Sequence, residues 1–215
     1  MERVLADRYR LRHRIGGGGM GAVFEAEDVV LERTVAAKVL PGVGTGDREF
    51  LREARALSRL RHHGIVGLYD AGSDRGDAYL ILELVSGQTL RERLDAGPLD
   101  AQEAGRVGHE LAEALGHAHR LGVVHRDLSP SNVLLDRSGR VRLTDFGIAR
   151  LSEATATSAS EVWGTPAYMA PEQVAGEAVG PPADVYALGL LLLEALTGRR
   201  AFPGAPRESG FARLH

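Results

Sequence analysis

Two residue types that this chain almost never uses each appear once. Lys38 is the only lysine among 26 lysine and arginine residues, and Asn132 is the only asparagine in the chain. Lysine differs from arginine in presenting a compact ammonium group on a flexible stem. Chance could leave one lysine in an arginine-rich chain, but the pattern favours a site that needs such a group, as phosphate binding does.

A glycine run precedes the lysine and suggests the same chemistry. Residues 16–23 are Gly-Gly-Gly-Gly-Met-Gly-Ala-Val, which fits the pattern G-x-G-x-x-G-x-V. Four adjacent glycines satisfy many patterns by accident, so a merely flexible turn is the alternative. A dinucleotide-binding turn leads into a helix, whereas Val23 to Ala26 is strand-like. The context therefore favours a loop folded over the phosphates of ATP.

Further motifs follow in the second half of the chain. His125–Asn132 has the sequence HRDLSPSN, Asp145–Gly147 has DFG, and Gly164–Glu172 has GTPAYMAPE, followed by Asp184. Together with the glycine run and the single lysine, this set resembles the protein kinases in content and order. The resemblance is strongest to bacterial serine/threonine kinases of the eukaryotic (Hanks) type and covers residues 9 to about 204.

The resemblance implies ATP-dependent phosphorylation of serine and threonine hydroxyls on proteins, with Mg²⁺ or Mn²⁺ as the metal. Such transfer needs in-line positioning and charge neutralisation more than covalent help. Asp127 would accept the proton of the substrate hydroxyl. Lys38 would bind phosphates and be held in place by Glu53. Asp145 and Asn132 would supply oxygen ligands to the metal.

The resemblance also implies a set of nucleotide contacts. Glu83 and Val85 would offer backbone groups to adenine, and Leu82 would line the back of the pocket. Apolar residues would enclose the ring, although an ordinary hydrophobic core explains those residues equally well. The implied nucleotide-binding residues are Ile15, Gly16, Gly17, Gly18, Gly19, Met20, Gly21, Val23, Ala36, Lys38, Glu83, Val85 and Leu134.

The segment from Ile148 to Trp163 is rich in serine and threonine and by resemblance forms an activation loop, with a plain flexible loop as the alternative. Arg126 would give a phosphate on this loop a cationic partner. We expect autophosphorylation here, by self-association of two copies. Thr165 resembles the residue that contacts the catalytic aspartate. The candidate acceptors are Thr155 and Thr157, which are favoured, and then Ser158 and Ser160.

The chain departs from the family at two places. Ser129 stands where most of these kinases have a lysine that meets the transferred phosphate, and a hydroxyl cannot neutralise charge. Beyond the region of resemblance only residues 205–215 remain, whereas the family continues with helices that cover Leu190 to Leu196 and supply an arginine to Glu172. We therefore expect a truncated or frame-shifted gene product with a partly exposed apolar helix. Arg207 or Arg213 could replace the missing arginine, although nothing in the sequence supports this.

Two other functions remain open. The first is a catalytically weak or inactive nucleotide-binding or scaffold module derived from a truncated kinase. The second is a phosphotransferase for small molecules, which would share the lobed fold. The segment from Gly164 to Glu172 argues against this one, because it resembles the peptide-docking segment of protein kinases.

Hydrophobic periodicity predicts the elements that position these residues. The expected class is α+β, with a two-lobed kinase-like fold. A small antiparallel sheet and one helix would form the first lobe, residues 9–86. The expected strands are Tyr9 to Leu11, Ala22 to Ala26, Thr34 to Leu40, Ile65 to Tyr69 and Ala78 to Leu84. The expected helix begins at Asp47, ends at Gly64 and places Phe50, Leu51, Ala54, Leu57 and Leu60 on one face.

The second lobe, residues 87–215, should be mainly helical and incomplete. Asp100 and Glu103 form a capping box ahead of an apolar stripe that Gly122 closes. The segment from Asp184 to Thr197 is apolar nearly all round, which predicts a helix buried on every side. The apolar stripe of the helix that begins after Asp100 consists of Ala104, Val107, Leu111, Leu115 and Ala118.

Composition narrows the setting. With 215 residues and 44% hydrophobic composition, the chain can bury a sizeable core. A chain without cysteine fits a reducing compartment, and we expect a cytoplasmic location with no membrane segment. A net charge of -3 gives no electrostatic reason to expect a nucleic-acid partner.

Overall fold

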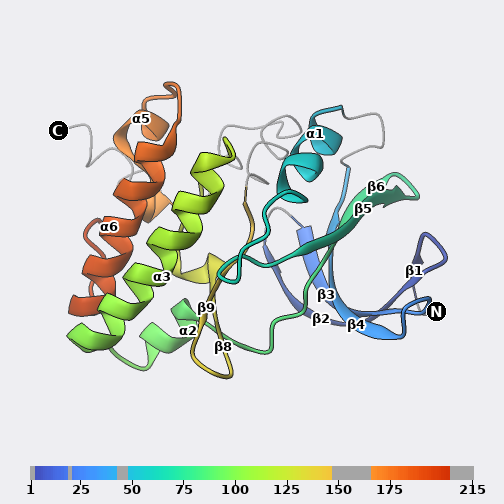
Figure 1. Cartoon of the computed structure of the whole chain (residues 1–215), viewed down its shortest axis with the longest axis horizontal. Helices are drawn as coiled ribbons and strands as arrows, with labels where there is room; N and C mark the ends of the chain where they lie inside the picture. The colour runs from blue at the N-terminus through green and yellow to red at the C-terminus, as the bar shows by residue number, and fades with distance from the viewer. Residues whose placement is uncertain (1–2, 19–20, 43–47, 147–165, 204–215) are drawn as a thin grey trace. The chain divides into compact units, whose positions relative to one another are not determined.

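The computed structural model describes residues 3–18, 21–42, 48–146 and 166–203. Among these residues the chain forms two compact units (Figure 1). The first contains the residues up to 61 and residues 66–84, and the second contains residues 62–65 and those from 85 onward. Within the described residues, no helix has the length and hydrophobicity needed to span a bilayer.

The first unit is built on a six-stranded antiparallel sheet with strand order β1-β2-β3-β4-β6-β5. The five predicted strands are confirmed as elements with somewhat different bounds, and β1 was not predicted. Helix α1 contacts the sheet at β5. The elements of this unit are β1 (Val4–Leu5), β2 (Tyr9–Gly18), β3 (Gly21–Asp28), β4 (Arg33–Leu40), α1 (Arg48–Leu57), β5 (Leu68–Asp74) and β6 (Asp77–Leu82).

Alternation along the strands divides the sheet into two faces. One face carries the unit's hydrophobic core, in which Tyr9 and Tyr79 lie 6.0 Å apart between ring centroids. The other face carries the neighbouring residues in each strand, Lys38 among them. The core residues are Leu5, Tyr9, Leu11, Ala26, Val35, Ala37, Val39, Tyr79 and Ile81.

Two expectations for this unit were wrong in their bounds. The helix ends at Leu57, well before Gly64, and its expected start at Asp47 lies outside the described residues. On its apolar face, Phe50 is 2% exposed and Leu51 is 40% exposed. The strand expected from Ile65 begins at Leu68, and Ile65 instead forms an isolated bridge within the second unit.

The second unit combines a small sheet with helices. The long helix is confirmed: the Asp100 side chain caps it by accepting from the Glu103 amide at 2.8 Å, and the whole predicted stripe is buried. The strand β7 and helix α2 were not predicted. The elements are β7 (Gly87–Thr89), α2 (Leu90–Asp95), α3 (Ala101–Arg120), η1 (Pro130–Asn132), β8 (Val133–Asp136), β9 (Val141–Leu143), η2 (Pro166–Tyr168), α5 (Pro171–Val174) and α6 (Pro181–Thr197).

Helices α3 and α6 lie side by side in the second unit (Figure 1). They approach closely at Gly108, where a Cβ would come within 3.1 Å of the Leu192 side chain. The expectation that α6 is buried on every side is wrong. Leu191 is fully buried, but Val185 is 62% exposed and Leu196 is 48% exposed. Leu193, on the same helix, is 45% exposed.

Candidate active site

The glycine run forms the ends of β2 and β3, where the backbone needs glycine. Gly17 has φ 130° and Gly21 has φ 128°. A Cβ on Gly21 would lie 2.2 Å from the Val39 carbonyl oxygen, so no side chain fits there. Gly19 and Met20, also predicted to bind nucleotide, lie outside the described residues.

Several predicted nucleotide contacts share one face of the sheet. Val23 pairs directly with Lys38, and Ala36 pairs with Leu82. Directly paired residues in an antiparallel sheet, and residues two apart in one strand, point to the same side. These four residues therefore lie together on the face opposite the hydrophobic core. Ile15 is also in β2 and is 44% exposed.

Lys38 is 6% exposed, which is unusual for a lysine. A buried ammonium group is stable only with anionic or hydrogen-bonding partners. The predicted partner, Glu53, lies in α1 of the same unit and is half-buried. Their pairing stays a prediction.

The predicted adenine contacts follow β6. The Glu83 N–H donates to the Gly67 carbonyl at 2.8 Å, and the Gly67 N–H donates to the Glu83 carboxylate at 3.3 Å. Because the Glu83 N–H is engaged, its carbonyl is the backbone group suited to adenine. Val85 opens the next segment of the second unit, and Leu134 lies in β8 of that unit.

In the second unit, Asn132 orients the predicted base. Its Nδ2 donates to the Asp127 carbonyl at 2.8 Å and to Asp127 Oδ2 at 3.1 Å. The one-turn helix η1 places the amide within this reach, and the Asn132 N–H bonds to the Ser129 carbonyl at 3.0 Å. The structure thus brings the chain's only asparagine and its predicted base together.

Asp184 anchors the backbone just before the base. It is 1% exposed and lies in the first turn of α6. Its carboxylate accepts from the backbone N–H groups of His125 and Arg126, each at 2.8 Å, and from His119 Nε2 at 2.7 Å. A buried carboxylate with three donors is well compensated and holds its neighbours in fixed positions.

His125 links the same loop to the segment of Asp145. Its Nε2 faces the Thr144 carbonyl at 2.9 Å, so Nε2 carries the proton and Nδ1 accepts from the Asp127 N–H at 3.3 Å. The ring packs on Phe146 with centroids 4.6 Å apart. Asp145 itself has φ 66°, a backbone conformation that favours glycine and is held here by its neighbours.

The residues predicted to hold the metal fit an oxygen-preferring cation. Asn132 uses Nδ2 in both of its side-chain bonds to Asp127, which leaves Oδ1 as the atom that would meet a cation. Asp145 adds a carboxylate. Within the described residues, no three His, Asp or Glu side chains gather as a site that could hold a metal ion. Mg²⁺ is commonly held by one or two protein ligands, waters and substrate phosphates.

Ser129 does not present its hydroxyl at the surface. The residue is fully buried, and its Oγ has no hydrogen-bond partner among the described residues. The sequence places this hydroxyl where most of these kinases have a lysine that meets the transferred phosphate. The structure instead leaves it as an unsatisfied polar group in the interior.

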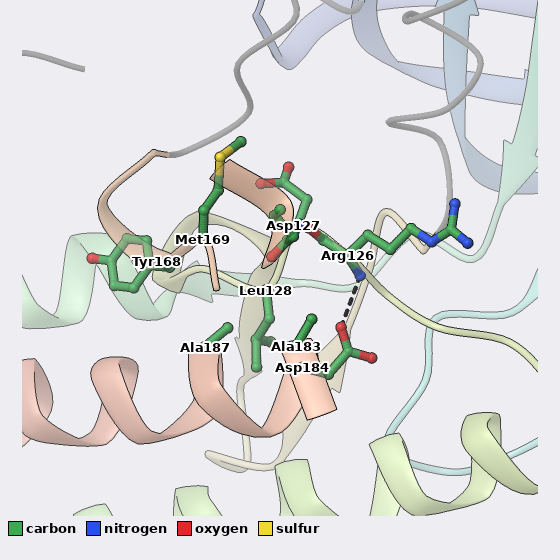
Figure 2. Close-up of a pocket in the computed structure, with 9 residues that line it drawn as sticks. Arg126, Asp127, Leu128, Tyr168, Met169, Ala183, Asp184 and Ala187 are labelled. Carbon is green, nitrogen blue, oxygen red and sulfur yellow. Dashed lines mark hydrogen bonds between the residues drawn. The ribbon is translucent and has the colours of Figure 1, made fainter. Parts of the chain in front are cut away.

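A small pocket lies beside the predicted base. It is lined by the loop of Asp127, by the segment around Met169 and by the first turns of α6. Figure 2 shows the Arg126 guanidinium extending away from α6, while the Arg126 backbone N–H faces Asp184. The whole predicted activation loop and Thr165 lie outside the described residues, as do Arg207 and Arg213.

Sequence reasoning missed three groups around this pocket. His119 binds Asp184, and Gln173 binds the backbone of Arg126. Tyr168 forms a buried cluster with Glu194 and Arg91, described below. Of these residues, only Gln173 could have been found from the sequence, because a glutamine at the third position of a helix is typical of a capping box.

A family model described as the protein kinase domain matches residues 9–213. The serine/threonine-protein kinase PrkC of Bacillus subtilis is 43% identical over 206 residues, which are 93% of this chain and 32% of that protein. The serine/threonine-protein kinase PknL of Mycobacterium tuberculosis is 41% identical over 207 residues, 94% of this chain and 52% of that protein.

The fold has a solved counterpart as well. The crystal structure of a variant of the PknI kinase domain from Mycobacterium tuberculosis matches with a TM-score of 0.77 at 28% identity, covering 95% of this chain and 78% of that chain. The chain spans about a third of the length of PrkC and about half of the length of PknL.

Proposed function

This chain belongs to the protein kinase family, and from that premise we propose that it transfers a phosphoryl group from ATP to serine or threonine hydroxyls of proteins, its own activation segment included. One observation carries the proposal. Asp127 is oriented through both its carbonyl and its carboxylate by Asn132, beside a backbone that buried Asp184 fixes.

The proposed roles follow from this arrangement. The Asp127 carboxylate, which Asn132 orients, would take the proton of the substrate hydroxyl. Asn132 Oδ1 and the Asp145 carboxylate would hold Mg²⁺, or Mn²⁺ in its place. The metal, when bound, would neutralise charge on the phosphates. Lys38 would hold the phosphates from its face of the sheet, and Glu53 would hold Lys38.

Relatives support the choice of substrate. PrkC and PknL are named serine/threonine-protein kinases. We propose the same residue class as acceptor here, with Thr155 and Thr157 as sites of autophosphorylation between two associated copies. A cytoplasmic location is part of this proposal, supported by a chain that uses no cysteine. The charge of -3 favours protein partners over nucleic acid.

A second candidate is a nucleotide-binding module with little catalysis. The buried Ser129 hydroxyl favours it, because Ser129 stands where the family usually has a lysine near the transferred phosphate. Such a protein would bind ATP through Lys38 and would leave its own threonines unmodified.

The test is incubation of the purified chain with labelled ATP and Mg²⁺, followed by mass spectrometry of residues 148–165. Asp127→Asn keeps the shape of the base but removes its proton-accepting charge, so we expect label incorporation to fall by about 100-fold or more. Asp95→Asn, an exposed acid on α2, is the matched control and should behave like the parent.

Each alternative has its own outcome. Phosphate on Thr155 or Thr157 in the parent and the control, and not in Asp127→Asn, supports the kinase. Thermal stabilisation by ATP without incorporation supports the binding module. Transfer to a small alcohol such as an aminoglycoside, with none to protein, supports the phosphotransferase for small molecules.

A further inference from the structure

The Arg126–Asp127 peptide group is held by a side chain from another element. Gln173 is the third residue of α5, and its Nε2 donates to the Arg126 carbonyl at 2.7 Å. Its Oε1 accepts from the Ala170 N–H at 3.0 Å. One amide group therefore caps the start of α5 and binds the backbone immediately before Asp127.

Arg126 needs such support because its backbone is strained. Its φ is 69°, in the left-handed region that a residue with a side chain rarely adopts. A conformation of this kind persists only where the surroundings over-determine it. The Arg126 N–H bonds to Asp184 Oδ1 at 2.8 Å, and the next N–H, of Asp127, bonds to His125 Nδ1 at 3.3 Å. The carbonyl between these two N–H groups is the one that Gln173 holds.

We propose that Gln173 is a positioning residue for the catalytic base: its amide fixes the Arg126–Asp127 peptide plane and so makes the orientation of Asp127 depend on the seating of the 170–173 segment. The inference rests on the proposed function, because it assigns Asp127 the role of base. Asp184 binds the Arg126 N–H, and Gln173 binds the Arg126 carbonyl. Together the two bonds set the position of the Asp127 Cα and so the direction of its side chain.

The chemistry of the amide separates this role from simple helix capping. Glutamate at the same position keeps the acceptor for the Ala170 N–H and is favoured near a helix N-terminus. Its carboxylate cannot donate to the Arg126 carbonyl and would place an oxygen against an oxygen. If Gln173 only caps the helix, Gln173→Glu should have the kcat of the parent. If Gln173 positions the base, Gln173→Glu should have a lower kcat. Gln173→Met removes both bonds at similar volume.

The experiment compares the parent, Gln173→Glu and Gln173→Met on the full chain. We expect both variants to lower kcat for autophosphorylation about ten-fold, with the KM for ATP changed less than two-fold, because the nucleotide contacts proposed above do not include Gln173. Lowering the pH from about 8 to about 6 should raise the ratio of kcat between Gln173→Glu and the parent. Protonation converts the introduced carboxyl into a donor for the Arg126 carbonyl, a recovery that Gln173→Met cannot show.

Amide hydrogen exchange provides a measurement that needs no catalysis. We expect the Arg126 and Asp127 amides to exchange several-fold faster in Gln173→Glu than in the parent, with α3 unchanged. Unchanged exchange overturns the inference, and so does an unchanged kcat in an active parent. A parent that transfers no phosphate refutes the proposed function instead, and exchange alone then decides whether Gln173 holds the loop.

Discussion

At Asp28 a carboxylate is fully buried and remains ionised, because its neighbours supply enough donors. Arg8 binds both carboxylate oxygens, at 2.7 and 2.8 Å. The N–H groups of Val30 and Leu31 each donate to Oδ1 at 3.3 Å, which closes the turn between β3 and β4. The hydrogen bonds from the Arg8 guanidinium lower the pKa of Asp28 to about 2.

This shift predicts an acid-dependent stability. A carboxyl whose folded-state pKa is depressed contributes stability that is present above its ordinary pKa of about 3.9 and is lost as the pH falls through about 2. Asp28→Asn should therefore flatten the fall in unfolding free energy between about pH 4 and pH 2, measured by denaturant titration at each pH. Asp77→Asn is the control, since its ion pair with Arg3 is partly exposed and contributes little. Equal slopes in parent and Asp28→Asn would contradict the prediction.

Ser129 makes the opposite case, because its buried Oγ lacks a partner among the described residues. Removing an unsatisfied buried hydroxyl while keeping the Cβ is neutral or stabilising. We expect Ser129→Ala to change the unfolding free energy by about 0 to +1 kcal/mol in favour of the folded state. Urea unfolding measures this, and Ser138→Ala, which removes a bonded hydroxyl in an exposed turn, gives the comparison. A loss of more than about 1 kcal/mol in Ser129→Ala would mean that the hydroxyl has a partner.

Between elements, a buried cluster joins α2, η2 and α6. Tyr168 donates its hydroxyl to Glu194, and Arg91 binds Tyr168 Oη at 2.8 Å and Glu194 Oε1 at 2.7 Å. Tyr168 is 3% exposed, and burial together with the bond to Glu194 raises the pKa of its phenol. Tyr168 lies two residues before the 170–173 segment, so the cluster ties the chain that enters this segment to α6.

Tyr168→Phe removes one donor from the buried Glu194 carboxylate. We expect a loss of about 1–2 kcal/mol in unfolding free energy, because the carboxylate keeps Arg91 but loses the hydrogen bond from the phenol. Chemical denaturation measures the loss. Tyr186→Phe is the matched control on α6, since the half-buried Tyr186 forms no side-chain hydrogen bond within the described part of the chain. Equal stabilities of the two variants would show that the hydroxyl of Tyr168 is dispensable.

At the scale of the whole molecule, three histidines distinguish the acid response of the second unit. His62 lies between His63, at 4.2 Å between ring centroids, and His117, at 5.2 Å. His62 Nδ1 accepts from the Gly64 N–H at 3.1 Å, a bond that only the neutral ring can accept. The Gly64 carbonyl in turn accepts from Leu143 of β9 at 2.8 Å.

Desolvation, followed by the nearby His63 and His117, lowers the pKa of His62, while Glu113 opposes and Arg120 assists the shift. A depressed histidine contributes stability that is present above its ordinary pKa of about 6.5 and is lost as the pH falls through its folded value.

The second unit should therefore weaken as the pH falls below about 6.5, at a higher pH than the one at which Asp28 is protonated in the first unit. Amide hydrogen exchange at a series of pH values shows which of the two units weakens first. In His62→Asn the side-chain oxygen can still accept from the Gly64 N–H, but the side chain does not titrate. The loss of stability of the second unit at mildly acidic pH should therefore disappear in this variant. Weakening of the first unit before the second would contradict this order.

The sequence by itself determined the residues that matter and the elements with strict periodicity. The strand-like runs in β3 and β4 are local patterns, so the sequence alone predicts these two strands. The stripe of α3 and the cap at Asp100 are equally local, since they depend on spacings of three and four residues. The motifs around Asp127 and Asp145 named the chemistry for the same reason: each is contiguous in the chain.

Only the tertiary structure decided what holds those motifs. The bonds from His119 to Asp184 and from Gln173 to Arg126 span 65 and 47 residues, and no local pattern records such pairings. The same holds for α6, where composition predicted burial all round but Val185 and Leu196 are exposed, because burial depends on which elements pack against each face. The left-handed backbone of Arg126 is likewise imposed by distant side chains, since nothing in its own residue type favours it.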